Sequence, residues 1–498
     1  MQRKQLTLVI VSLLVVVLSV SLAYFTTRII GKGKDVSVTS ANLQIVFTDS
    51  DGAISGSNIE PGWSDTKTFT VENNSKSEYK YNIVIKDLLN TFVTEGYLQY
   101  KITSTNNGYN MTEFKDIPKS SIATDTILAY SVVIPNGVTQ SYTIEFKYAN
   151  DESVDQSDDM GKKLSGTLFI TEGTEPTLLT QLLADKSTVL TRTDFSTALT
   201  TDNTNTLYTS TEDSKTVYYF AGNATDNWVK FGKNESNQDL YWRIIRTNKD
   251  GGVRLLYHGT STTATDAYIG KSKFNTTYND PMYVGYMYGT SGSLVNNRTN
   301  TNNSTIKTTI DTWYTRNLEA KGYTKYLSTT AVYCNDRSVT NGTYSTSSSF
   351  NYAALTRLAS NKKTPSYDCA TTEDKFTADT STGNGKLDHP IALMTADEVS
   401  FAGGLWGTKA PTWYYKNSAN GSSTGDTWWW LLSPYYWGSR ANVFNVYGSP
   451  NPSYLVNYYV DSTLGVRPAI SLKSCTLYST GNGSASDPYT IKETTSGC

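Results

Sequence analysis

The chain has few of the side chains that carry most enzyme chemistry. Its 498 residues include only two histidines and four cysteines. Because zinc sites and histidine-based catalytic groups depend on these residue types, so small a supply argues against both. The sequence therefore predicts no catalytic residues, no metal site and no cofactor.

Charge is also scarce. Charged residues make up 18 % of the chain, and 43 Lys and Arg against 45 Asp and Glu give a formal net charge of -2. A chain without a basic excess has little to attract a polyanion, which excludes nucleic acid as a predicted partner. Thr, Ser, Asn and Tyr supply the polarity instead. Such a neutral, hydroxyl-rich composition is typical of exported binding proteins.

The first residues predict a membrane segment. The run Leu6–Tyr24 carries no charge and would span roughly 28 Å as a helix, close to the thickness of a bilayer core. Arg3 and Lys4 before it favour an N-terminus inside the cell. Residues 1–35 are therefore expected to form a single-pass anchor, with the remainder on the extracellular face. Alternatively, cleavage near Ala23 would make the segment a signal peptide and release a secreted protein.

Export allows the cysteines to form disulfides. Four cysteines have three possible pairings, and free thiols are a further possibility. We expect the sequential pairing because it closes two compact loops. It joins Cys334 with Cys369 and Cys475 with Cys498.

Residues 36–172 predict an antiparallel β-sandwich. About seven short β-rich segments, many alternating apolar with polar residues, are separated by turn signals such as "IPNGVT". The expected strands are 42–47, 66–73, 79–85, 97–103, 127–134, 141–148 and 164–170. The stretches "IEPGWSDTKTFTVENNS" and "IPNGVTQSYTIEFKY", with "AYFT" near the start, resemble camelysin-like fibre and matrix proteins of Gram-positive-type bacteria. That resemblance covers about the first third of the chain.

A linker is expected at residues 173–204, with a short helix over 178–183. Residues 205–498 are expected to form a second domain of α+β type. In it, "TNKDGG" predicts a hairpin turn, and residues 304–327 predict a helix. Thr395 and Glu398 have the spacing of a capping box at the start of another helix, which Gly403 would end.

The second domain resembles a family of exported bacterial domains. The resemblance lies in "YYFAGNATDNWVKFG", "YWRIIRTNKDGGVRLLY", "YCNDRS", "LMTADEVSFAGG", "WWWLLSP" and "GVRPAISLK". It implies a fold similar to the formylglycine-generating enzyme and C-type lectins, with a ligand surface between the Trp-rich strand and the closing "GVRPA" strand. Some relatives are diversified in this segment by retroelements. No cysteine lies in the aromatic segment, so the formylglycine-generating activity is not expected.

The aromatic segment "TWWWLLSPYYWGSRANVFNVYGS" provides the candidate site. Strand alternation predicts that Trp428 and Trp430 face the core while Trp429 faces away, or the reverse. Residues 435–464 then have the Tyr, Ser, Asn and Gly composition of an antibody paratope, between flanks that look like rigid scaffold. A loop and hairpin without function in a Tyr-rich protein is the alternative. The predicted ligand-binding residues are Trp429, Tyr435, Tyr436, Trp437, Ser439, Arg440, Asn442, Phe444, Asn445, Tyr447, Asn451, Tyr454, Asn457, Tyr458, Tyr459 and Asp461.

The remaining chemical groups are given structural roles. His258 and His389 each stand without metal-ligand spacing, and both are interpreted as structural. Asp336 beside Arg337 is interpreted as a surface charge pair, and Glu398 as a helix cap. The sequence thus predicts a non-enzymatic cell-surface adhesion protein that binds a glycan or protein on another cell or surface. The alternatives are an extracellular enzyme acting on cell-wall or host polymers, and a structural fibre or matrix subunit.

Overall fold

The computed structural model describes most of the chain in two compact units. The described residues are 43–47, 52–55 and 59–498, except 187, 265–266, 360–362, 409–427 and 448–453. The units are Met1–Glu175 and Pro176–Cys498, and each is treated by itself. Strands account for 41 % of the residues and helices for 13 %, so sheets carry the architecture of both units.

The predicted membrane segment lies outside the described residues. None of the helices in the described part of the chain has the length and apolar character that crossing a bilayer requires. The anchor at residues 1–35 stays a prediction.

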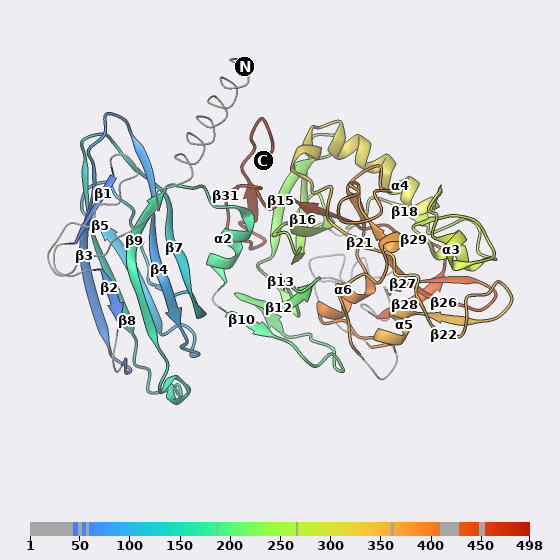
Figure 1. The fold of residues 1–498 in the computed structure, drawn as a ribbon, viewed down its shortest axis with the longest axis horizontal. Helices are drawn as coiled ribbons and strands as arrows, with labels where there is room; N and C mark the ends of the chain where they lie inside the picture. Colours follow the sequence, from blue (N-terminus) through green and yellow to red (C-terminus); the bar gives the residue numbers. More distant parts are fainter. Residues whose placement is uncertain are drawn as a thin grey trace, which may run out of the picture. The chain divides into compact units, whose positions relative to one another are not determined.

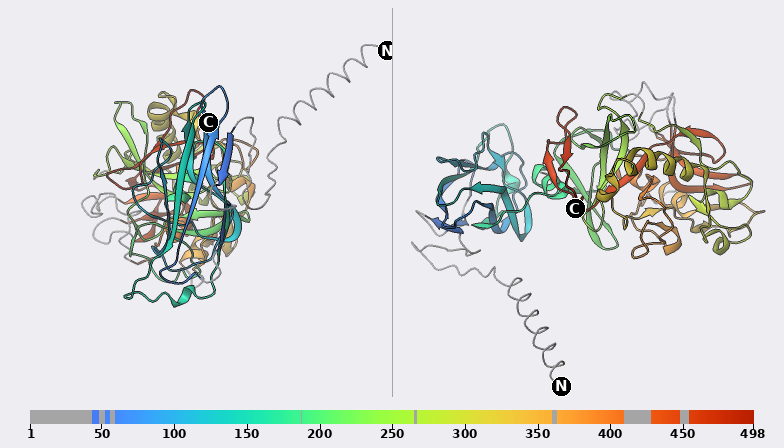
Figure 2. Two further views of the ribbon diagram at one scale, coloured as in Figure 1. Left: turned by 90° about the vertical axis from the view of Figure 1, so that its left-hand side faces the viewer. Right: turned by 90° about the horizontal axis from the view of Figure 1, so that it is seen from above.

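The first unit consists of two antiparallel sheets (Figures 1 and 2). In strand order, one sheet holds β1 (Leu43–Phe47), β3 (Ser64–Asn73), β8 (Thr139–Tyr148), β5 (Leu98–Ser104) and β6 (Lys115–Asp116). The other holds β2 (Ala53–Ser55), β9 (Leu164–Glu172), β4 (Tyr79–Asn90) and β7 (Ser120–Ile134). All seven predicted strands are present, and β2 and β6 are additional.

Alternation along these strands builds one core from both sheets. Strand β8 buries every second residue, among them Tyr142 and Ile144. Phe69 of β3 lies opposite Tyr142 in the register, and their rings stack at 5.0 Å. The Tyr142 hydroxyl lies 2.6 Å from that of Tyr81 on β4 in the second sheet. The period-2 pattern of the sequence therefore predicted the buried face correctly.

The second unit contains a ten-stranded sheet assembled from distant parts of the chain (Figure 1). Its main path is β10 (Thr188–Thr191), β12 (Thr206–Glu212), β13 (Lys215–Tyr219), β16 (Asp239–Thr247), β15 (Trp228–Lys233), β32 (Tyr489–Ile491) and β31 (Tyr478–Thr480). Strand β17 (Val253–Gly259) joins β16 to β30 (Pro468–Leu472), which also pairs with β25 (Ile391–Leu393). The predicted hairpin connects β16 to β17, and Gly251 in its turn adopts a φ of 83°.

A seven-stranded sheet carries the aromatic segment. Its main path is β18 (Lys271–Lys273), β29 (Thr463–Gly465), β26 (Trp429–Trp437), β23 (Phe350–Tyr352) and β22 (Val339–Asn341). Strand β27 (Ala441–Val446) pairs with β26 and with β28 (Leu455–Tyr459). The described two-stranded sheets are β11 (Asp202–Asn203) with β14 (Asn223–Ala224), β19 (Met287–Tyr288) with β20 (Asn302–Asn303), and β21 (Tyr333–Cys334) with β24 (Lys375–Phe376).

Short helices cover this unit. The α-helices are α2 (Leu178–Asp185), α3 (Leu294–Asn297), α4 (Thr305–Tyr314), α5 (Ala353–Leu358) and α6 (Ala396–Phe401). The shorter turns are the 3-10 turns η2 (Pro281–Val284), η4 (Tyr323–Tyr326) and η5 (Thr372–Asp374), and the π-helical turn η3 (Thr315–Glu319), which follows α4 directly. The Ser304 hydroxyl caps α4, and the predicted capping box of Thr395 and Glu398 begins α6. Helix α2 and strand β10 lie within the expected linker range, yet Leu178 and Leu182 are fully buried in the second unit.

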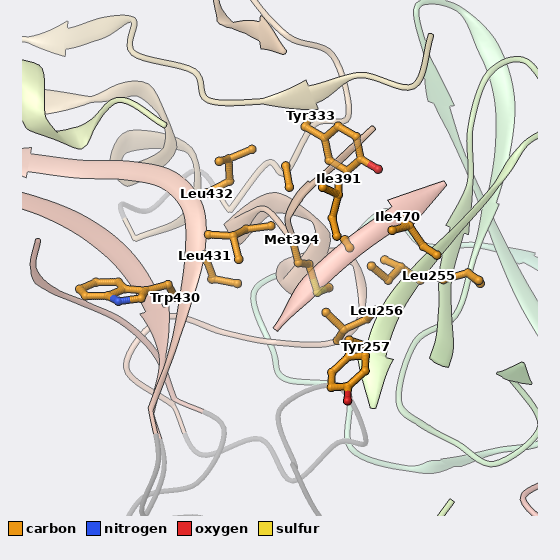
Figure 3. Packing of buried hydrophobic residues seen from close by; sticks show 14 of the residues in the cluster. Leu255, Leu256, Tyr257, Tyr333, Ile391, Met394, Trp430, Leu431, Leu432 and Ile470 are labelled. Carbon is orange, nitrogen blue, oxygen red and sulfur yellow. The ribbon is translucent and has the colours of Figure 1, made fainter. Parts of the chain in front are cut away.

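The core of the second unit lies where its sheets and α6 meet. Figure 3 shows Leu255, Leu256, Ile391 and Ile470 packed with the Met394 side chain and with residues of the Trp-rich strand. Both disulfides have the predicted sequential pairing, Cys334–Cys369 and Cys475–Cys498.

The tryptophan run does not alternate as predicted. Trp429 and Trp430 are both fully buried, whereas Trp428 is half-buried. The guanidinium of Arg467 lies 4.8 Å from the Trp429 ring on one face. On the other face, the Trp430 indole donates to the Ser272 carbonyl at 2.9 Å. Because both faces of β26 are covered, adjacent residues are buried together.

We expect Trp430→Ala to destabilise the second unit by about 3–5 kcal/mol, because it removes a buried ring and leaves a cavity. Chemical denaturation followed by tryptophan fluorescence measures this loss. Trp63→Ala in the first unit, where the ring is only half-buried, is the control. An unchanged unfolding midpoint for Trp430→Ala would mean that the ring is not packed as described.

Candidate ligand-binding surface

The outer part of the seven-stranded sheet leaves large aromatic rings exposed. Strand β28 pairs with β27 and lies at an edge of the described sheet. Tyr458 and Tyr459 on this strand are 37 % and 40 % exposed, and Tyr278 in the loop after β18 is 40 % exposed. Exposed aromatic area of this kind is characteristic of binding surfaces.

These rings belong to one continuous set of contacting side chains, which we name the aromatic ridge. Its members, in order of contact, are Tyr278, Arg440, Tyr459, Tyr458, Trp428, Tyr447 and Tyr454. They come from β28, from the ends of β26 and β27, and from the loop after β18. The ridge therefore combines segments that are more than 100 residues apart in sequence.

Arg440 joins two parts of the ridge. Its guanidinium lies 4.3 Å from the centre of the Tyr278 ring and 4.3 Å from that of Tyr459. One of its terminal nitrogens donates to Asp461 at 2.7 Å. A guanidinium between two aromatic faces gains cation–π attraction from both, and its planar shape suits this stacking. The position of Arg440 is thus fixed by two rings and one carboxylate.

The turn before β27 directs Arg440 into this position. Ser439 adopts a φ of 84°, a backbone conformation that residues other than glycine rarely take. Gly438 precedes it, and a Cβ at that residue would lie 2.3 Å from the Tyr436 ring. The "WGSR" sequence therefore supplies a residue without a side chain where the turn passes the ring.

The rest of the ridge is formed by cross-strand ring contacts. Trp428 lies 3.7 Å from Tyr447 and 4.9 Å from Tyr458, measured between ring centres. Tyr447 in turn contacts Tyr454 at 6.3 Å, and its amide donates to the Tyr454 carbonyl at 2.8 Å. Aromatic pairs at these separations stabilise a sheet beyond the area that they bury.

Several predicted ligand-binding residues do not reach this surface. Strand β27 buries all six of its residues and β26 buries seven of its nine, so both faces of these strands are covered. The buried residues are Trp429, Trp437, Asn442, Phe444 and Asn445, each at most 5 % exposed. They belong to the core of the second unit, and this corrects their assignment to the ligand surface.

The other predicted residues lie beside the ridge. Tyr435 stacks on Trp406 at 5.0 Å, and burial raises the pKa of its hydroxyl. Asn457 is half-buried and donates to Asn442, while Ser439 is exposed. Tyr436 is half-buried against Gly438. Asn451 lies outside the described residues.

Two members of the ridge were missed from the sequence. Trp428 had been considered only as a core or flanking residue of the tryptophan run. Tyr278 lies in the polar stretch "NTTYNDP", about 150 residues before the aromatic segment. An isolated tyrosine in a polar loop carries no sequence signal that would link it to Arg440.

Two acidic residues of the second unit, Asp336 and Asp397, are held in buried ion pairs. Asp336 is 5 % exposed and accepts from Arg357 at 2.8 Å, and Asp397 accepts from the same guanidinium at 2.9 Å. Arg337 is fully buried and pairs with Asp374, not with Asp336. The prediction of a surface pair between Asp336 and Arg337 is therefore wrong.

The space beside this cluster is small. A cavity of about 20 Å³ is lined by Arg357, Asp336, Asp397 and their neighbours. A cavity of that volume has room for about one water molecule. Because Arg357 pairs with both carboxylates and the cavity beside them among the described residues is small, the cluster fits a structural role.

Glu398 is the centre of a second buried ion network. One carboxylate oxygen accepts from Arg246 at 2.9 Å and from Arg254 at 2.7 Å, and the other accepts from the Thr395 amide at 2.9 Å. Burial opposes ionisation, but the two guanidinium groups and the cap outweigh it and lower the pKa of Glu398 to about 2. The residue thus joins its predicted capping role to long-range pairing with β16 and β17.

Both histidines are packed against aromatic rings. His258 is 1 % exposed with its ring 4.4 Å from that of Trp228. Burial, assisted by Arg243 and Arg467, lowers the pKa of His258 well below its usual value. His389 stacks on Tyr314 at 4.6 Å. Within the described ranges, His, Cys, Asp and Glu side chains form no group that could hold a metal ion.

Comparison with known proteins assigns no activity to these groups. One family model, described as a domain of unknown function (DUF6273), matches residues 325–474. The matched segment contains β26, β27, β28 and the ion pairs of Arg357 with Asp336 and Asp397. It covers less than a third of the chain and does not include Tyr278. No curated protein matches the sequence.

Acid should weaken the second unit through Glu398. The folded-state pKa of about 2 lies below the ordinary value of 4.5, so this stabilisation is complete above about pH 4.5 and is lost as the pH falls towards 2. The shift corresponds to about 3 kcal/mol. Glu398→Gln should cost about 3–5 kcal/mol at pH 7, because it leaves two buried guanidinium groups without their carboxylate.

Thermal unfolding between pH 2 and pH 7 measures both effects. The exposed Glu319→Gln is the matched control and should follow the unchanged chain. The stability of Glu398→Gln should fall less between pH 4.5 and pH 2 than that of the unchanged chain. If both fell equally, another group would have to account for the loss.

Proposed function

We propose that this chain is a cell-surface adhesion protein whose aromatic ridge binds a glycan or protein ligand on another cell or surface. The continuous contact of side chains from Tyr278 to Tyr454 along an edge strand carries the proposal. Six of its seven members are aromatic, and the seventh is an arginine held between two rings. Tyr, Trp and Arg are the residues that contribute most to binding energy at protein interfaces.

The way the ridge is held supports this function. Each ring contacts another member of the ridge, and Arg440 is fixed by Asp461 as well. Side chains that are ordered before binding lose little conformational entropy when the ligand arrives. The ridge also lies beside strand β27, all of whose residues are buried, and beyond it strand β26, most of whose residues are buried.

The remaining parts of the chain have places in the same proposal. Residues 1–35 anchor the protein in the membrane with the N-terminus inside, or are cleaved near Ala23. The first unit is a camelysin-like β-sandwich that presents the second. The second unit is the C-type-lectin-like domain, related to the fold of the formylglycine-generating enzyme. For the first unit, the sandwich assignment is supported by its two antiparallel sheets.

The double variant Tyr458→Ala, Tyr459→Ala should abolish ligand capture. Both rings are about 40 % exposed, so their removal should lower the unfolding temperature by only a few degrees. Binding of the full chain to a glycan array and to a panel of intact cells measures the effect, with a loss of at least tenfold expected. Tyr218→Ala, a half-buried tyrosine on β13, is the matched control.

Unchanged binding by the double variant would contradict the proposal. The same holds if the double variant lost as much thermal stability as Trp430→Ala, because the rings would then be part of the core.

Natural variation should follow exposure if the surface is diversified. Sequencing of this gene across one bacterial population should show substitutions at ridge positions such as Tyr447, Tyr458 and Tyr459. Buried positions on the neighbouring strand β27, such as Val446 and Phe444, should stay apolar. Variation spread equally over buried and exposed positions of residues 435–464 would argue against a diversified ligand surface.

A further inference from the structure

A lysine of helix α4 is buried between two carboxylates. The side chain of Lys307 is 0 % exposed, although lysine is rarely buried so deeply unless it is paired. Its Nζ donates to Asp311 Oδ2 at 2.6 Å and to Asp388 Oδ2 at 2.7 Å. Asp311 lies one turn further along α4, whereas Asp388 lies in the segment before β25, 81 residues away. We name these three residues the lysine triad. It shares no residue with the aromatic ridge.

Two carboxylates are more than one ammonium group needs. A single negative charge neutralises Lys307, so a second one at the same place would be a surplus charge, which burial disfavours. Asp388 is the ionised member, because its hydrogen bond with Lys307 lowers its pKa. Burial raises the pKa of Asp311, an effect that Lys307 only partly offsets. Asp311 is therefore the carboxyl group of the triad that tends to hold a proton.

The segment that carries Asp388 is held on both sides. Leu387 before it is buried, and its amide donates to the Thr377 carbonyl at 3.0 Å. His389 after it stacks on Tyr314 of α4 at 4.6 Å. The Asp388 side chain itself is 65 % exposed, so its neighbours rather than its own burial keep its carboxylate at Lys307. This exposure also gives a small leaving group a path to solvent.

The surroundings of the triad favour uncharged groups. Next to Lys307 on α4, Ile306 and Ile310 are fully buried. Tyr286 is fully buried as well, and the raised pKa of its hydroxyl is caused by burial first and then by the nearby charge of Asp311. In such an apolar setting, an ammonium and a carboxylate both lose their charge when one proton passes between them.

We propose that Lys307 and Asp388 join in an intramolecular amide bond, for which Asp311 carries the protons. Lys307 first passes a proton to Asp388, which leaves a neutral amine and a neutral carboxyl group. The amine nitrogen then attacks Cγ of Asp388, and the N–C bond forms as the C–OH bond breaks. One oxygen of Asp311 takes a proton from the nitrogen, while the other gives its own proton to the departing hydroxyl. The products are the amide, one water molecule and Asp311 in its original state.

The distances suit this reaction. The carbon under attack is bonded directly to the Asp388 oxygen that lies 2.7 Å from Nζ, so the reacting atoms start close together. Asp311 reaches the same nitrogen at 2.6 Å, which is within the reach that proton transfer requires. Both reacting groups belong to the chain, and the condensation needs no oxidant or other co-reactant.

The bond ties two distant parts of the second unit together. It closes a loop of 81 residues between α4 and the segment that leads into β25. Strand β25 pairs with β30 in the ten-stranded sheet, so the helix becomes covalently attached to that sheet. Unlike an ion pair, the amide persists in acid and in denaturant. It therefore limits the unfolded chain in the way that a disulfide does.

Peptide mapping of the purified full chain tests the proposal. The chain is reduced, denatured and digested with trypsin, and the fragments are weighed by mass spectrometry. We expect the fragment of residues 299–316, uncleaved at Lys307, to be joined to the fragment that begins at Leu387. The joined mass should be lower than the sum of the two by one water molecule. Separate fragments with cleavage after Lys307 would overturn the proposal. Loss of water within residues 299–316 alone would also overturn it, since the bond would then be to Asp311.

Lys186 is the matched control within the same digest. Its side chain is 1 % exposed and pairs with Asp226, but no second carboxylate of the described residues lies within ion-pair distance of it. The fragments that contain Lys186 and Asp226 should therefore stay separate. If they were joined to the same extent, sample handling rather than the triad would account for the bond at Lys307, and the proposal would fail.

Asp311→Asn tests the proton carrier. The joined fraction should fall at least tenfold, because a side-chain amide does not exchange protons as a carboxyl group does. The two side chains have nearly the same shape, so the variant should fold, with an unfolding temperature lower by several degrees because the link is missing. A fully joined Asp311→Asn would overturn the role of Asp311. If this variant fails to fold, the map of the unchanged chain still decides whether the bond exists.

Discussion

The buried carboxylate of Glu398 is the interaction on which the second unit depends. It caps helix α6 through the Thr395 amide and accepts from Arg246 on β16 and Arg254 on β17. A buried ion is tolerated only when its partners are in place, so the helix and the two strands fix one another. Arg246 extends the network to Glu212 on β12 at 3.0 Å.

From this network a chain of contacts leads outwards to the aromatic ridge. The amide of Ala396, the first residue of α6, donates to the Ser433 hydroxyl in the middle of β26 at 3.0 Å. Strand β26 then holds β27, and β27 holds β28, whose outer residues form the ridge. The ridge thus connects to the charges that fix the fold through β26 and β27. Binding residues on the edge of a rigid scaffold are a recurrent arrangement in proteins.

The sequence predicted features that depend on near neighbours and missed those that depend on distant ones. The strands of the first unit, the hairpin at "TNKDGG", the capping box at Thr395 and the sequential disulfides all follow from local patterns. The pairing of Arg337 with Asp374 and the bridging of Asp336 and Asp397 by Arg357 join segments whose proximity only the fold creates. For the same reason, the sequence found Arg440, Tyr458 and Tyr459 for the candidate surface but not Tyr278. The sequence also assigned five buried residues of β26 and β27 to the candidate surface, because composition does not show that both faces of these strands are covered.

The ten-stranded sheet sets an order of events during synthesis. Strand β15 pairs with β32 across Val229 and Tyr489, and β17 pairs with β30 across Leu255 and Ile470. Strands β15 and β17 therefore cannot complete their pairing until partners more than 200 residues later have been synthesised. Such distant pairing makes folding of this unit slow. The first unit has all its strands by Glu172 and can fold while the rest is still being translated. During that interval the apolar strands β16 and β17 have no cover, so a chaperone that holds the chain extended would protect this stretch above all others.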